Sequence, residues 1–213
     1  GQIPGAFGII LRNAFQAPEA VQGGLLGGVI RMGVARGLFS NEAGLGSAPI
    51  AHGAARTDEP VREGLVAMLG PFIDTIIVCS ITALVIVITD ATSVTQVDGQ
   101  LTAEAFSLGL GSRFGASFVS FSILLFAFST LIGWSYYGDR AADYLFGHRA
   151  VLPYRLVFVA MIVLGACIQW DTIISVSDTM NGLMAAPNLI ALVVLSPVVA
   201  LAPRDYFARR NKE

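Results

Sequence analysis

Long apolar runs with almost no charge constrain this chain more than any other feature. Residues 116–137 contain no charged side chain, and residues 65–89 contain one, Asp74. A helix that crosses a bilayer needs about 20 consecutive, mostly apolar residues. Soluble domains usually carry roughly a quarter charged residues, whereas this chain carries 13% and is 54% hydrophobic. The sequence therefore predicts an all-α, polytopic membrane protein.

Five transmembrane helices are predicted within one transmembrane domain that covers residues 1–213. The first span is interrupted and covers residues 20–55, where Arg31, Arg36 and Glu42 stand among many glycines. The other four spans are continuous runs, and Pro187 and Asn188 are expected to kink the last of them. These runs cover residues 65–89, 116–137, 154–170 and 179–202.

Basic residues gather on one side of the predicted spans. Nine of the thirteen Lys and Arg residues lie in the segments 54–64, 138–155 and 203–213. The segments 90–113 and 170–178, on the other side, contain only one. Short loops rich in Lys and Arg remain in the cytoplasm. We therefore predict a multi-pass protein of the plasma (inner) membrane, with its N-terminal end outside and its C-terminus in the cytoplasm.

Composition argues against several functions. The net charge of −2 gives no sign of the clustered basic surface that nucleic-acid binding requires. Cys79 and Cys167 lie far apart in apolar runs without metal-ligand spacing, so we interpret them as small buried hydrophobic residues. The chain begins at Gly1 and its first residues lack the pattern of a signal peptide. We therefore expect that the N-terminal part of a longer chain precedes it.

The interruption of the first span is the most informative stretch. Residues 36–49 have the sequence RGLFSNEAGLGSAP. Glycine lowers helix stability by about 1 kcal/mol relative to alanine, and Ser and Asn side chains compete for backbone hydrogen bonds. Pro49 removes a donor and clashes with the carbonyl group of Leu45. We predict that the helix breaks near residues 40–46.

Other interpretations of this stretch remain open. Small residues also allow intact membrane helices to pack closely. A glycine-rich phosphate loop would need a preceding strand and a Walker-type lysine, and neither is predicted here. A broken helix at membrane depth needs protein or water to satisfy its freed backbone groups, and it is typical of binding sites in secondary transporters.

Three stretches of the chain resemble the alanine or glycine:cation symporter family, and the resemblance extends over nearly the whole chain. They are RGLFSNEAGLGSAPIAHGAARTDEPVREGLVAMLGPFIDTIIVC (36–79), FAFSTLIGWSYYGDRAADYLFG (126–147) and DTMNGLMAAPNLIAL (178–192). The resemblance implies a LeuT-type fold, in which two five-helix repeats are inverted relative to each other. This chain then corresponds to the second repeat, the C-terminal half, and the interrupted helix is the sixth core helix. The first repeat, at the N-terminal side, is the missing partner.

A candidate binding face lies on the span 116–137. Thr130, Trp134 and Tyr137 follow i, i+4, i+7 spacing and therefore share one side of a helix. Hydroxyl oxygens suit a hard cation such as Na⁺, and a tryptophan can wall off a small substrate side chain. The resemblance implies that Ser129 and Thr130 bind a sodium ion. Hydrogen bonding between helices by Ser and Thr is the competing interpretation.

The resemblance implies symport of a small neutral amino acid, alanine or glycine, with Na⁺ as the coupling ion and without another cofactor. The predicted substrate-binding residues are Phe39, Asn41, Gly44, Thr130 and Trp134. An ion-channel subunit and a membrane-embedded enzyme that uses Glu42, Asp74 or His52 are the alternatives. The sequence has no paired carboxylates at fixed spacing, no HExxH and no GxSxG motif, so we expect no enzyme.

Charged residues near the spans have both functional and structural interpretations. Asp74 could serve transport or pair with an arginine of the interrupted helix, because a carboxylate inside a membrane needs a reason to be there. Glu42 could relay a proton, bind a cation or pair with Arg36. We expect Asp139 and Asp143 to form a solvated cluster at the cytoplasmic end of their helix.

Overall fold

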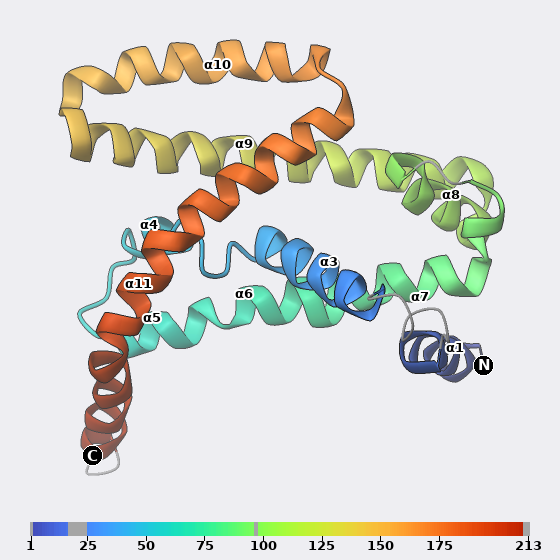
Figure 1. The fold of residues 1–213 in the computed structure, drawn as a ribbon, viewed down its shortest axis with the longest axis horizontal. Helices are drawn as coiled ribbons and strands as arrows, with labels where there is room; N and C mark the ends of the chain where they lie inside the picture. The colour runs from blue at the N-terminus through green and yellow to red at the C-terminus, as the bar shows by residue number, and fades with distance from the viewer. Residues whose placement is uncertain (1, 17–24, 96–97, 211–213) are drawn as a thin grey trace. The chain divides into compact units, whose positions relative to one another are not determined.

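The computed structural model describes residues 2–16, 25–95 and 98–210, and the regular elements in these ranges are all helices (Figure 1). The α-helices are α1 Ile3–Gln16, α3 Leu25–Ser40, α4 Ala48–His52, α5 Pro60–Ala67, α6 Leu69–Pro71, α7 Ser80–Thr89, α8 Asp98–Leu110, α9 Ser112–Phe146, α10 Val151–Cys167 and α11 Trp170–Arg210. A π-helix, η1, covers Phe72–Cys79, and two 3-10 helices cover Ala91–Ser93 (η2) and His148–Ala150 (η3).

Four helical runs among the described residues are long and apolar enough to cross a bilayer, as expected for a polytopic membrane protein. They are Pro60–Thr89, Arg113–Phe146, His148–Cys167 and Trp170–Arg210. Each overlaps one of the continuous apolar runs of the sequence. Large apolar side chains on them are exposed, such as Leu124 at 64% and Val193 at 72%. Such surfaces require lipid or further transmembrane protein around them, because contact between apolar groups and water is unfavourable.

The chain forms two compact units, and each unit is assembled from two separate segments. The first unit contains Gly1–Val34 and Pro71–Leu131, and the second contains Ala35–Gly70 and Ile132–Glu213. In the first unit, α7 packs against α1, α8 and η1. In the second unit, α11 contacts α5, and α10 contacts η3. The five-helix inverted repeat remains a prediction.

The run Pro60–Thr89 changes its backbone hydrogen bonding in the middle, where η1 is a π-helix. Pro71 directly precedes η1. Proline lacks an N–H group and crowds the carbonyl group four residues earlier, so regular α-helical hydrogen bonding is interrupted at this position. Asp74 lies within η1 and is half-buried. π-helical turns inside α-helices are frequent at functional sites, but a proline precedes this one, so both interpretations of Asp74 remain open.

In the second unit, α10 folds back along the end of α9 (Figure 1). Gly138 permits this approach, because a Cβ atom there would overlap the hydroxyl group of Tyr154. One residue later, the carboxylate of Asp139 pairs with Arg155, and the shortest distance, Nη2 to Oδ2, is 2.6 Å. Asp139 is only 5% exposed. The prediction of a solvated cluster is therefore wrong for Asp139, whose carboxylate α10 covers.

Candidate functional site

The interrupted segment leaves the helix at Ser40, where α3 ends, and α4 begins at Ala48. Three residues between them have positive φ: Glu42 at 51°, Gly44 at 77° and Gly46 at 82°. Glycine adopts this conformation readily, whereas other L-residues do so at a cost of roughly 1–2 kcal/mol. The break predicted near residues 40–46 is present at these positions.

Two residues that were expected to disrupt the helix do not do so. Pro49 lies in the first turn of α4, where its missing N–H group has no helical acceptor in any case. Gly37 lies inside α3, with open space around the position of a Cβ atom. The positive φ angles that follow Asn41 therefore open the backbone, and Pro49 helps to start the next helix.

Hydroxyl groups hold the side chain of Glu42, the non-glycine residue with positive φ in this turn. Ser47 Oγ donates to Glu42 Oε2 over 2.8 Å, and the hydroxyl group of Tyr137 is also hydrogen-bonded to Glu42. Ser47 is only 3% exposed. Arg36 pairs with Asp178 of α11 over 2.6 Å. The carboxylate at the break therefore meets two neutral donors, while the nearby arginine is engaged elsewhere.

An amide from α11 holds the opened backbone. Asn188 Nδ2 donates to the carbonyl oxygen of Gly44 over 2.9 Å. A Cβ atom at Gly46 would lie 3.1 Å from Oδ1 of the same asparagine, so a side chain there would require Asn188 to shift. Asn188 lies near the middle of the apolar run 179–202. Because an unpaired carbonyl group in hydrocarbon costs several kcal/mol, this hydrogen bond makes an open backbone tolerable at that depth.

The residues that hold the break were only partly visible in the sequence. Tyr137 lies on the predicted binding face, but the pattern does not indicate Glu42 as its partner. α11 is a continuous helix through Pro187, and the kink expected at Pro187 and Asn188 remains a prediction. An amide in the middle of an uncharged span needs a hydrogen-bond partner, and this signal identifies Asn188 without revealing the partner.

The predicted substrate residues of the interrupted segment lie around this turn. Phe39 is in the last turn of α3 and is 43% exposed. Asn41 follows the helix, and its Nδ2 donates to the carbonyl oxygen of Gly37 over 3.0 Å. Gly44 presents its carbonyl group to Asn188. These three residues are thus within or beside the break, although their contact with a substrate remains a prediction.

The predicted residues of α9 divide between the two compact units. The rings of Trp134 and Tyr137 are in edge contact, with centroids 5.8 Å apart, and Tyr137 reaches Glu42, so Trp134 is connected to the break. Ser129 and Thr130 lie about one turn earlier on the same helix, in the first unit. Ser129 Oγ donates to the carbonyl oxygen of Phe126 over 2.9 Å, within its own helix. Sodium binding by Ser129 and Thr130 remains a prediction.

Comparison with known proteins identifies one transporter family along the whole chain. A profile of the sodium:alanine symporter family matches residues 1–213. The chain is 48% identical over 213 residues to an uncharacterized transporter from Haemophilus influenzae, covering 98% of this chain and 46% of that protein. It is 44% identical over 217 residues to the sodium/alanine symporter AgcS from Methanococcus maripaludis, covering 100% of this chain and 47% of that protein. It is 40% identical over 212 residues to the probable sodium/glutamine symporter GlnT from Bacillus subtilis, covering 99% and 44%.

The chain spans about half the length of the curated relatives that it matches. The family and these relatives are transporters, and the four long apolar helical runs fit a multi-pass membrane protein. A transporter family does not carry out the acid–base chemistry considered for Glu42, Asp74 or His52, so the enzyme alternative is set aside. This chain, with a helix broken at Glu42–Gly46 and supported by Asn188, belongs to the sodium:alanine symporter family.

Proposed function

We propose that this chain forms one half of a carrier that couples the entry of a small neutral amino acid to Na⁺. The observation that carries the proposal is the break at Glu42–Gly46, which Asn188 supports from the middle of an apolar run. In a broken membrane helix, half-helix N-termini attract anionic groups and freed carbonyl groups attract cations. An amino acid offers both charges, so it suits such a break.

Alanine or glycine is the proposed substrate. Phe39 and Trp134 provide bulk beside the break and leave limited space for a substrate side chain. The relatives bear different names, since AgcS is a sodium/alanine symporter and GlnT is a probable sodium/glutamine symporter. Glutamine is therefore the competitor that discriminates best between a small and a larger pocket.

Ser129 and Thr130 are the proposed Na⁺ ligands of this chain, and no other cofactor is required. Their hydroxyl oxygens are hard donors, and they precede Trp134 by about one helical turn. Coupling follows if ion and substrate together stabilise the closed site better than either does alone.

The test is uptake of radiolabelled alanine into proteoliposomes that contain the full gene product. We expect accumulation above the external concentration when Na⁺ is high outside, with inhibition by unlabelled glycine and weak inhibition by glutamine. A channel could not accumulate substrate against its gradient, so equilibration alone would contradict the symporter. Residues 1–213 by themselves should give no uptake, because their described part provides one broken helix, whereas the proposed fold has one in each repeat. Robust uptake by this segment would contradict the half-carrier proposal.

The ion assignment is tested separately with Thr130→Val, which keeps the side-chain shape and removes the hydroxyl oxygen. A hydrogen bond between membrane helices is worth on average only about 0.6 kcal/mol, so we expect the variant to fold. The Na⁺ concentration for half-maximal uptake should rise several-fold. Thr82→Val is the matched control, because the Thr82 hydroxyl donates to the carbonyl oxygen of Val78, four residues earlier in the run Pro60–Thr89, over 3.0 Å. Equal Na⁺ dependence in both variants would remove Thr130 from the ion site.

A further inference from the structure

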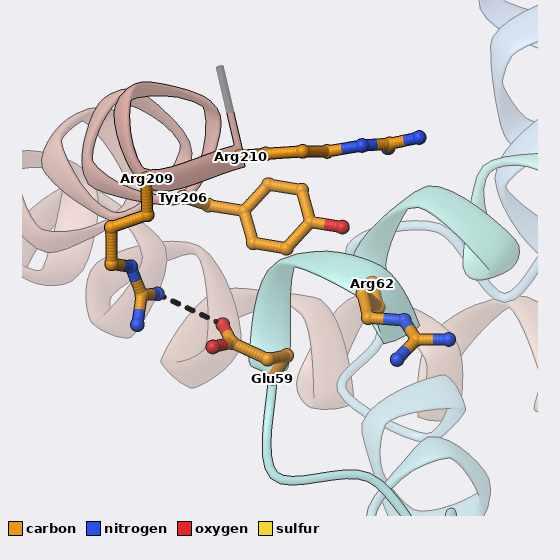
Figure 2. A pocket seen from close by; sticks show the side chains of 5 residues that line it. All are labelled: Glu59, Arg62, Tyr206, Arg209 and Arg210. Atoms are coloured by element: carbon orange, nitrogen blue, oxygen red, sulfur yellow. Dashed lines mark hydrogen bonds and ion pairs between the residues drawn. The ribbon is translucent and has the colours of Figure 1, made fainter. Parts of the chain in front are cut away.

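A cavity of about 420 Å³ lies in the second compact unit, between the start of α5 and the end of α11 (Figure 2). Its lining residues are Glu59, Arg62, Tyr206, Arg209 and Arg210. Three guanidinium groups and one carboxylate leave this lining with an excess of positive charge. The cavity shares no residue with the break, so the transport proposal does not account for it.

The arginines of the cavity have different roles. Arg209 Nη2 lies 3.1 Å from Glu59 Oε2, and this ion pair joins α11 to the residue that precedes α5. Glu59 is thereby neutralised by a group that turns away from the other two arginines (Figure 2). The pair closes one side of the cavity and leaves its remaining charge positive.

Arg62 and Arg210 remain available to a ligand. Within the described parts of the chain, neither guanidinium group has a carboxylate at ion-pair distance. The carboxylate of Glu63, next to Arg62, is instead paired with His52, and its Oε1 lies 2.7 Å from His52 Nδ1. In Figure 2 both guanidinium groups extend past the hydroxyl end of Tyr206, Arg210 above its ring and Arg62 below it. Two planar guanidinium forks and a hydroxyl donor match the oxygens of a phosphate group.

The cavity lies at the height of lipid head groups. Arg62 precedes the apolar run 65–89 by three residues, and Tyr206 follows the run 179–202 by four. At a helical rise of 1.5 Å per residue, they lie about 4.5 Å and about 6 Å beyond the hydrocarbon, within the interfacial layer. Tyrosine is enriched at this depth. The basic residues here also belong to the side that the Lys and Arg distribution predicts to be cytoplasmic.

Apolar surface continues from the cavity toward the membrane along the same two helices. Val66 on α5 is 57% exposed, and Val199 and Leu201 on α11 are 61% and 57% exposed. A free phosphate ion would not use this surface, whereas lipid acyl chains would cover it. The combination of a basic cavity and adjoining apolar helix surface therefore favours a phospholipid over a soluble anion.

We propose that this cavity binds the phosphate group of an anionic phospholipid at the membrane surface. Arg62 and Arg210 hold the phosphate oxygens, Tyr206 donates from its hydroxyl group, and the pair Arg209–Glu59 keeps α5 and α11 together around the head group. Phosphatidylglycerol is the probe that tests this site.

The experiment measures lipid binding by native mass spectrometry of the delipidated full gene product in a neutral detergent. Phosphatidylglycerol and phosphatidylcholine with identical acyl chains are added in parallel. The variant Arg62→Gln/Arg210→Gln is compared with Arg56→Gln/Arg149→Gln, which removes the same charge on the same predicted side but outside the cavity. Because Arg62 and Arg210 are proposed to hold the phosphate directly through charge-assisted hydrogen bonds, the preference for phosphatidylglycerol should fall about tenfold or more in the cavity variant. Arg56 and Arg149 do not line the cavity, so the control should change this preference less than about twofold.

A second variant and a competitor complete the test. Arg62→Lys/Arg210→Lys keeps the charge but loses the planar guanidinium groups, so the preference for phosphatidylglycerol should fall several-fold. If the glutamine variant does not fold, this lysine variant is measured in its place. Inorganic phosphate should not displace bound phosphatidylglycerol. An unchanged lipid preference in whichever cavity variant folds would overturn the proposal, as would displacement by inorganic phosphate, which would identify a soluble-anion site.

Discussion

Residues 41–49 and residues 182–188 both place glycine, asparagine and proline inside an apolar segment. The chain leaves the helix in the first segment, between α3 and α4, whereas α11 continues through the second from Trp170 to Arg210. The same residue types therefore produce a break in one region and none in the other.

The two segments differ in how many backbone groups lose their helical hydrogen bonds and in which side chains bond to those groups instead. Pro187 removes a single N–H group, which a membrane helix tolerates. The other segment has positive φ at Glu42, Gly44 and Gly46, so a whole turn is opened. Asn188 bonds the carbonyl group of Gly44 there, and Ser47 and Tyr137 bond the side chain of Glu42. The continuous helix thus acts as the support of the broken one.

Gly46→Ala should have the largest effect. Gly46 combines a φ of 82° with a Cβ position 3.1 Å from Asn188 Oδ1, so alanine would be strained and crowded at once. The left-handed conformation alone costs an alanine roughly 1–2 kcal/mol, and we expect about 2–3 kcal/mol in all, with loss of Na⁺-driven uptake. The measurements are reversible unfolding in mixed micelles and uptake in proteoliposomes.

The matched change in the continuous helix is Gly182→Ala. Open space surrounds its Cβ position, and glycine inside a helix is less stable than alanine by roughly 0.5–1 kcal/mol. This variant should be slightly more stable and should transport normally. If Gly46→Ala and Gly182→Ala lowered the free energy of unfolding equally, the two glycines would not differ in the way that the broken and continuous helices require.

Trp134→Ala tests whether the side chain beside the break limits the size of the substrate. Trp134 is connected to the break through Tyr137, whereas Trp170 begins α11 and is 65% exposed. One methylene group in an apolar pocket is worth about 1–3 kcal/mol of discrimination. We expect Trp134→Ala to weaken alanine affinity and to admit valine and leucine as competitors of alanine uptake, while Trp170→Ala does neither. If Trp134→Ala still rejects both competitors and takes up alanine normally, Trp134 lies outside the pocket.

Asn188→Ala should have a moderate effect, because it removes the amide that satisfies the Gly44 carbonyl group. The expected loss is about 1–2 kcal/mol, the usual range for leaving a buried acceptor unsatisfied. The substitution also creates space beside Gly46, so it should partly relieve Gly46→Ala. A double-mutant cycle of unfolding free energies would then give a coupling of about 0.5–1 kcal/mol or more. Strict additivity would show that Asn188 and Gly46 do not meet.

Pro187→Ala should have the smallest effect. Alanine restores one backbone donor in a helix that is already continuous, and we expect a change in stability of less than about 1 kcal/mol with normal uptake. Circular dichroism and the same unfolding assay measure it. A large loss of uptake without a loss of stability would make Pro187 a hinge, and the description of α11 as a fixed support would then have to be abandoned.

The sequence by itself determines the membrane class and the location of the break. Uncharged runs of about 20 residues have no soluble alternative, because so much apolar surface must be removed from water. Gly44 and Gly46, spaced by one residue, also mark the position where the backbone can take positive φ. These are local properties, since they depend on residue type and on neighbours along the chain.

The partners that hold the break were decided by tertiary structure alone. Asn188 lies 144 residues from Gly44, and the sequence gives no means of pairing an amide with one carbonyl group at that separation. Asp139 likewise reads as a solvated carboxylate until α10 folds back and Arg155 covers it. Local preference decides where a chain can open, but in hydrocarbon the freed groups need donors and acceptors from other helices, and only packing brings these together.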